Sequence, residues 1–120
     1  MRLRAARGAI RVGSDDSESL LAATERLLSS MLQRNAIQDD DLVSVLFTAT
    51  DDLRSVFPAE AARRMGLGRI PLLCAQEIAV DGSMPSVIRV LLHFHSERSL
   101  DDVVHVYLDG AESLRDDVPE

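Results

Sequence analysis

Two neighbouring runs decide the fold: RIPLLCAQEIAV, residues 69–80, and SVIRVLLHFH, residues 86–95, which follows after a short turn. Both are apolar at most positions, as is typical of strands covered on two faces of a sheet. After Arg69 at the start of the first run, each apolar stretch contains one charged side chain, Glu77 in the first and Arg89 in the second. Two explanations are open: the charges form a buried ion pair across a hairpin, or they face a ligand pocket.

The other elements follow from the periodicity on either side of these runs. Apolar residues recur at helical spacing from Glu18 to Arg34, with acidic residues at the start and Asn35 able to close the helix. The remaining predicted elements are a strand at 3–12, a turn at 13–17, a strand at 42–49, a two-turn helix between Pro58 and Gly66, and a last strand at 103–108.

This order predicts an α/β (α+β) fold with a five-stranded mixed sheet and two helices on one face. Two helices cannot cover both faces of five apolar strands, so the second face predicts an oligomer. The length of 120 residues fits a single domain, which we assign to residues 1–115, and residues 116–120 read as an acidic, flexible C-terminal tail.

Composition and net charge limit the classes of binding partner and the compartment that we expect. The net charge is −7, from 20 acidic and 13 basic residues, so the overall field repels nucleic acid and anionic membranes, and we expect neither as a partner. One cysteine, Cys74, excludes an internal disulfide and fits a reducing compartment. No segment reaches the roughly 20 apolar residues that span a bilayer. We therefore expect a cytoplasmic protein.

Common catalytic motifs are absent from the sequence: there is no Gly-rich phosphate loop, no GxSxG elbow and no HExxH. His93 and His95 share a strand face, but no third ligand has diagnostic spacing, so we expect no metal. Cys74 is more typical of a small buried hydrophobe than of a nucleophile.

All 13 basic residues are arginine, and several stand at unusual positions. Arg7 lies between alanine and glycine in a predicted strand, where it either points to solvent from an edge or lets a ligand approach. Together with Arg63, Arg89 and Arg115, it predicts a pocket that focuses a multiply charged small anion.

Six segments carry a family resemblance: RGAI (7–10), FTATDDL (47–53), VFPAEAAR (56–63), PLLCAQE (71–77), IRV (88–90) and HVYL (105–108). In this order they resemble the monofunctional chorismate mutases of the trimeric pseudo-α/β-barrel (Bacillus-type) family, from Arg4 to Arg115. The resemblance implies a homotrimer with active sites at subunit interfaces. It implies a one-step Claisen rearrangement of chorismate to prephenate, in phenylalanine and tyrosine biosynthesis, without cofactor or metal.

The resemblance also implies roles for residues. Arg89 would donate to the ether oxygen, where negative charge grows; Arg7 and Tyr107 would bind substrate carboxylate; Glu77 and Cys74 would contact the ring hydroxyl. The catalytic set is then Arg89, Glu77 and Arg7. An apolar wall from the facing subunit and a group at the mouth complete the implied site: Phe57, Ala59, Leu72, Leu73, Arg63, Leu114 and Arg115.

Two positions depart from the family pattern, Glu60 where a lysine is expected and Leu73 where a threonine is familiar. An acidic Glu60 at the mouth would weaken capture of a dianion. Two alternatives stand beside the mutase: an enamine/imine deaminase of similar trimeric fold, and a non-catalytic trimer that senses a carboxylate metabolite. The joint presence of Glu77, Arg89 and Tyr107 favours the mutase.

Overall fold

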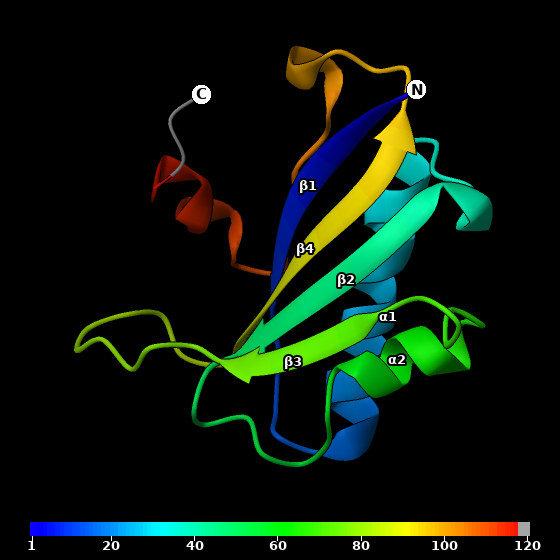
Figure 1. The fold of residues 1–120 in the computed structure, drawn as a ribbon. Helices are drawn as coiled ribbons and strands as arrows, with labels where there is room; N and C mark the ends of the chain where they lie inside the picture. Colours follow the sequence, from blue (N-terminus) through cyan, green and yellow to red (C-terminus); the bar gives the residue numbers. More distant parts are fainter. Residues whose placement is uncertain (118–120) are drawn as a thin grey trace.

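The computed structural model describes the backbone of residues 1–117 and the side chains of residues 1–115 (Figure 1). Within these residues the elements follow in the order β1 (Arg2–Arg11), α1 (Ser17–Arg34), the 3-10 helix η1 (Asp39–Asp41), β2 (Leu42–Ala49), α2 (Ala59–Arg64), β3 (Leu72–Gln76), β4 (Val87–Ser96), η2 (Leu100–Asp102), β5 (Val106–Leu108) and η3 (Glu112–Asp117).

The strands form one mixed sheet in the order β3-β2-β4-β1-β5. The central strand, β4, is antiparallel to both β1 and β2, while the outer strands β5 and β3 are parallel to β1 and β2. The predicted five-stranded mixed sheet is therefore confirmed. The hairpin considered for residues 69–80 and 86–95 is absent, because β2 lies between β3 and β4. Strand β3 reaches its place through the α2 crossover, which a parallel pair requires.

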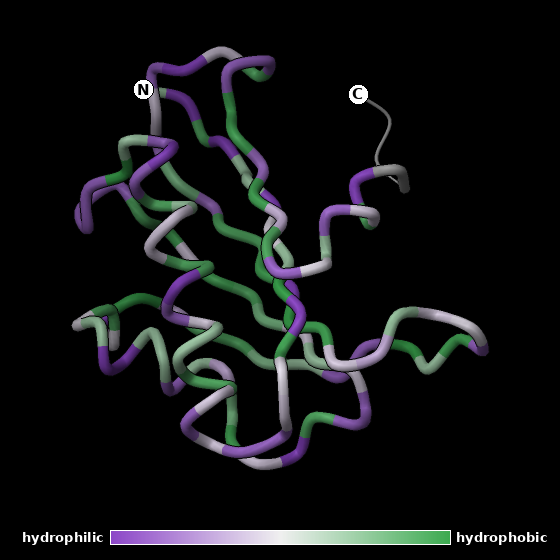
Figure 2. Tube along the Cα trace, turned by 180° about the vertical axis from the view of Figure 1, so that it is seen from behind, coloured by the Kyte–Doolittle hydropathy of each residue, from purple (hydrophilic) through white to green (hydrophobic). Residues whose placement is uncertain are grey.

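Both α-helices lie on one face of the sheet, as predicted (Figure 1). Helix α1 begins after Asp16, whose carboxylate accepts a hydrogen bond from the Ser19 N–H at 2.8 Å, a standard N-cap. It packs directly on the β1 backbone at Gly8, where an added Cβ would lie 2.5 Å from Met31 Sδ. Seen from the helix side, the strands behind α1 are predominantly hydrophobic (Figure 2). The core is thus a mostly aliphatic layer between sheet and helices, with Phe47 and Phe94 fully buried in it.

Two predicted strands are shorter than expected. The last one is confined to Val106–Leu108, which pairs with Gly8, Ala9 and Ile10 of β1. The run at 69–80 is a strand only from Leu72 to Gln76, and beyond it Ile78 and Val80 are 87% and 61% exposed in a loop that projects from the body (Figures 1 and 2). Apolar composition alone predicted pairing where no partner strand is present.

Neither α1 nor α2 covers the opposite face of the sheet, which we call the open face. No helix among the described residues is long and apolar enough to cross a membrane. The acidic tail expected at 116–120 falls largely outside the described residues: only its first two positions are described, and they belong to η3. The tail and the single domain over 1–115 stay predictions.

Candidate active site

Strand register places three of the predicted site residues on the open face. Arg89 of β4 pairs with Ala9 of β1, and Ala9 pairs in turn with Tyr107 of β5. Arg7 lies two positions before Ala9, so it projects from the same face. Ala9, between Arg89 and Tyr107, is buried in a small cluster against which Tyr107 packs. Arg7 does not lie on an edge strand, because β1 has a neighbour on each side.

Glu77 and Arg89 form an ion pair. Arg89 Nε donates to both carboxylate oxygens, at 3.1 Å to Oε1 and 3.0 Å to Oε2. The hydroxyl of Thr48 donates to the same Oε2 at 2.9 Å. The pair is not buried, since the Arg89 side chain is 42% exposed and the Glu77 side chain 18%. The two residues thus form an ion pair, but it is neither buried nor part of a hairpin, and solvent reaches the arginine.

A hollow of about 330 Å³ lies beside this pair, which we call the open-face pocket. It is lined by Arg7, Gly8, Leu46, Thr48, Arg89, Val90, Leu91, Tyr107 and Leu114. Among the described residues, no carboxylate pairs with the Arg7 side chain, and neither Nη atom of Arg89 donates a hydrogen bond. The Arg115 guanidinium carbon lies 5.7 Å from the centroid of the Tyr107 ring. The pocket therefore offers arginine donors to an anion.

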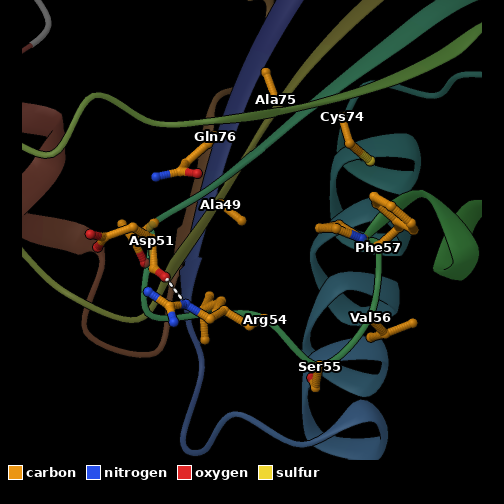
Figure 3. Close-up of a pocket in the computed structure, with 12 residues that line it drawn as sticks. Ala49, Asp51, Arg54, Ser55, Val56, Phe57, Cys74, Ala75 and Gln76 are labelled. Atoms are coloured by element: carbon orange, nitrogen blue, oxygen red, sulfur yellow. Dashed lines mark hydrogen bonds between the residues drawn. The ribbon is translucent and has the colours of Figure 1, made fainter.

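A second hollow of about 720 Å³, the loop pocket, is lined by residues 49–51, 53–58 and 74–76. Figure 3 shows the Cys74 side chain and the Phe57 ring on the same side of it. Phe57 is 74% exposed, an unusual state for a large aromatic ring. Arg54 Nε donates to the Asp51 carbonyl oxygen at 2.8 Å and stiffens the loop locally (Figure 3).

Asp15 holds this loop from outside. Its carboxylate accepts hydrogen bonds from the backbone N–H groups of Arg54 and Ser55, both at 3.0 Å. The N–H of Arg54 is the main cause that lowers the pKa of Asp15 below its ordinary value, because donors favour the charged form. The loop that carries Phe57 is thereby tied to the start of α1.

One chain does not bring all predicted site residues together. Arg7, Arg89, Tyr107 and Leu114 line the open-face pocket, and Glu77 reaches it through Arg89. Phe57 and Cys74 line the loop pocket instead. The other predicted residues line neither: Ala59 is buried, Leu72 packs against the core, Leu73 is 59% exposed, Arg63 bonds Glu60 at 3.1 Å, and Arg115 lies over Tyr107.

Sequence reasoning missed Thr48 and Leu46, which line the open-face pocket from β2. A signal was present, since strand alternation puts residues 44, 46 and 48 on one face and two of these carry a hydroxyl in an otherwise apolar run. The other hydroxyl, Ser44 Oγ, lies 3.1 Å from His93 Nδ1. Within the described residues, no group of three potential metal ligands surrounds His93 or His95.

Comparison with known proteins shows the family of the chain. The family model "Chorismate mutase type I" matches residues 3–118. Chorismate mutase AroH of Thermus thermophilus is 50% identical over 117 residues, which cover 97% of this chain and 96% of the relative. Chorismate mutase AroH of Bacillus subtilis (strain 168) is 37% identical over 119 residues, 98% of this chain and 94% of the relative.

A solved structure shares the fold as well. The chorismate mutase from Clostridium thermocellum superposes with a TM-score of 0.89 at 41% identity, over 91% of this chain and 97% of that one. Its sheet and helices therefore follow the same path through space. The match to the family model over nearly the whole chain, the identity to two mutases and the shared fold lead to one conclusion: this chain belongs to the type I chorismate mutase family.

Proposed function

We propose that this protein is an isomerase that rearranges chorismate to prephenate in aromatic amino acid biosynthesis, at a site shared between subunits of a homotrimer. The observation that supports the site most directly is the anchoring of Arg89. Its Nε is engaged by Glu77 at 3.0 and 3.1 Å, while its terminal nitrogens have no partner among the described residues. Beside it stands Arg7, which pairs with no described carboxylate.

The chemistry needs one well-placed cation. In a Claisen rearrangement the ether C–O bond breaks and a C–C bond forms within one molecule, so no group enters or leaves. Negative charge grows on the ether oxygen as the C–O bond lengthens, and Arg89 Nη donates to it. Because Glu77 already holds Nε, little reorganisation is needed when the charge develops. The Glu77 carboxylate meanwhile favours the positive ring end of the transition state.

The substrate is a dicarboxylate, and the remaining donors suit it. Arg7 and Tyr107 lie on the same face as Arg89 and bind carboxylate, which locally inverts the field of a protein with net charge −7. A millionfold acceleration requires roughly 8 kcal/mol, and one oxyanion donor supplies about 2.7–4 kcal/mol. The rest comes from holding the extended ether in its compact, reactive conformer.

A second subunit completes the site. The open face and the exposed side chains of Phe57 and Leu73 need a cover, and another copy of the chain supplies it. The loop pocket of one subunit then faces the open-face pocket of the next, so that Cys74 and Phe57 meet the substrate that Arg89 holds. Arg63 is engaged by Glu60 and must exchange partners to act at the mouth. Because the chain has a single cysteine, which fits a reducing compartment, we place the enzyme in the cytoplasm.

The test is a direct assay. Purified protein is mixed with chorismate, and loss of its ultraviolet absorbance is followed together with the appearance of prephenate. Light scattering on the same sample gives the mass of the assembly, which should be three chains. A rate no greater than the uncatalysed reaction refutes the activity, and an active monomer refutes the shared site.

Subunit mixing tests the shared site further. We expect Arg89→Ala and Phe57→Asp chains to be nearly inactive when purified alone. When the two variant chains are refolded together, they form random trimers in which an intact Arg89 faces an intact Phe57 at roughly a quarter of the interfaces. Activity should therefore return to about a quarter of that of the parent. Failure to recover any activity in demonstrated mixed trimers means that both residues serve the same subunit's site.

A further inference from the structure

Thr48 of β2 donates a hydrogen bond to Glu77, the one acidic residue in the proposed site. No step of the rearrangement gives Thr48 a role. We propose that Thr48 is a positioning residue that holds the Glu77 carboxylate so that Arg89 presents its terminal nitrogens to the substrate. This inference rests on the proposed function and deepens it. Thr48 acts through Glu77, so it is not a catalytic residue itself.

The sheet order creates the need for such a residue. Strand β2 separates β3 from β4, so Glu77 and Arg89 can meet only by reaching across β2. Thr48 is the residue at the crossing point, because it pairs with Arg89 on one side and with Ala75 on the other.

The hydrogen bonds define the carboxylate's orientation from two directions. Thr48 Oγ1 donates to Oε2 at 2.9 Å from β2, and Arg89 Nε donates to both oxygens from β4. The Glu77 backbone is itself fixed, since its N–H donates to the Ala49 carbonyl oxygen at 3.0 Å. The last side-chain torsion of a glutamate has a broad range of allowed angles, and contact with a single arginine leaves the carboxylate able to rotate within that range. The hydroxyl of Thr48 removes that freedom.

The consequence appears on the pocket side of Arg89. Because the Nε edge of the guanidinium is held by a fixed carboxylate, its plane is fixed too, and the Nη atoms stay available to an incoming oxygen. Displacement of a catalytic group by about 1 Å costs up to roughly 100-fold in rate. A hydrogen bond to a charged group is worth about 1.5–3 kcal/mol, which corresponds to roughly 10- to 100-fold.

Three variants test the inference. Thr48→Val keeps the shape and β-branching but removes the hydroxyl, and Thr48→Ser keeps the hydroxyl. Ser44→Ala is the matched control, since Ser44 projects from the same face of β2 and its hydroxyl contacts His93 instead. We expect Thr48→Val to lower kcat about 10- to 100-fold with KM changed less than threefold, and Thr48→Ser and Ser44→Ala to stay within about threefold of the parent.

A second readout does not depend on activity. The nuclear magnetic resonance signal of the Arg89 Nε–H should be sharp and slowly exchanging in the parent and in Thr48→Ser, and broadened in Thr48→Val. If the parent is inactive on chorismate, the proposed function fails, yet this signal still judges the positioning. An unchanged signal in Thr48→Val overturns the inference. So does a normal kcat in Thr48→Val, or an equal loss in Thr48→Ser, in an active parent.

Discussion

Replacement of Arg89 by lysine separates the proposed catalytic role from a structural one. Lysine keeps the positive charge but offers one compact ammonium group in place of a planar fork. In the structure Arg89 divides its donors: Nε binds the two oxygens of Glu77, and the Nη atoms face no described partner. A lysine Nζ cannot remain at Glu77 and also reach the substrate oxygen. One of the two contacts must be lost.

The size of each loss follows from its surroundings. Losing a preorganised donor at a developing oxyanion costs about 10²–10³ in kcat, or roughly 2.7–4 kcal/mol. The ion pair contributes far less to folding, because the Arg89 side chain is 42% exposed and such pairs give about 0–1 kcal/mol. The melting temperature should therefore fall by no more than about 6 °C.

The assay is steady-state kinetics with chorismate, combined with thermal unfolding of the same samples. Arg4→Lys is the matched control, since Arg4 also uses Nε within the sheet, donating to the Arg98 carbonyl oxygen at 2.9 Å. It should leave kcat within about twofold while changing stability by a similar amount. An Arg89→Lys protein that keeps near-normal kcat would refute the assignment of Arg89 as the cation at the ether oxygen.

Three further predictions concern pH and packing. Turnover should be nearly flat between about pH 6 and 9, because no proton is transferred in the rearrangement; a bell-shaped profile with unit slopes would instead indicate acid–base chemistry. Hydrogen bonds from the Ser14 hydroxyl first, then from Ser19, hold the pKa of Asp16 below its ordinary value. That stabilisation is present above the ordinary pKa and is lost as pH falls through the lowered pKa, so the melting temperature should drop between pH 5 and 3. The drop should be less steep in Asp16→Asn, because asparagine keeps the N-cap but does not titrate. Equal slopes in the two proteins would contradict this prediction. Gly8→Ala should lower the free energy of unfolding in urea by about 1–3 kcal/mol, because the added Cβ would lie 2.5 Å from Met31 Sδ. Gly13→Ala is the control, since a Cβ at Gly13 has open space. Equal urea midpoints for the two variants would contradict the close packing at Gly8.

The resemblance led to the site residues, and local patterns could have added Thr48. Alternation along Leu42–Ala49 already separates the Phe47 face from the Thr48 face, so a search for polar side chains on the latter finds it. No pattern in the sequence pairs Thr48 with Arg89, because that contact depends on which strand lies next to β4. The sequence left a hairpin between residues 69–80 and 86–95 open for the same reason: both runs are apolar enough to pair with several neighbours, and only the fold places β2 between them.

The sequence by itself determined the presence of the two α-helices and five strands, the placement of both helices on one face, and the presence of Glu77 and Arg89 in apolar runs. These follow from hydrophobic periodicity and from helix signals at residues such as Asp16 and Asn35, which act over a few neighbours. Only the tertiary structure decided that β2 lies between Glu77 and Arg89, and that Cys74 and Phe57 share a hollow that Arg7 and Arg89 do not line. Strand order is set by the burial of the whole sheet, a non-local free energy that no short segment contains.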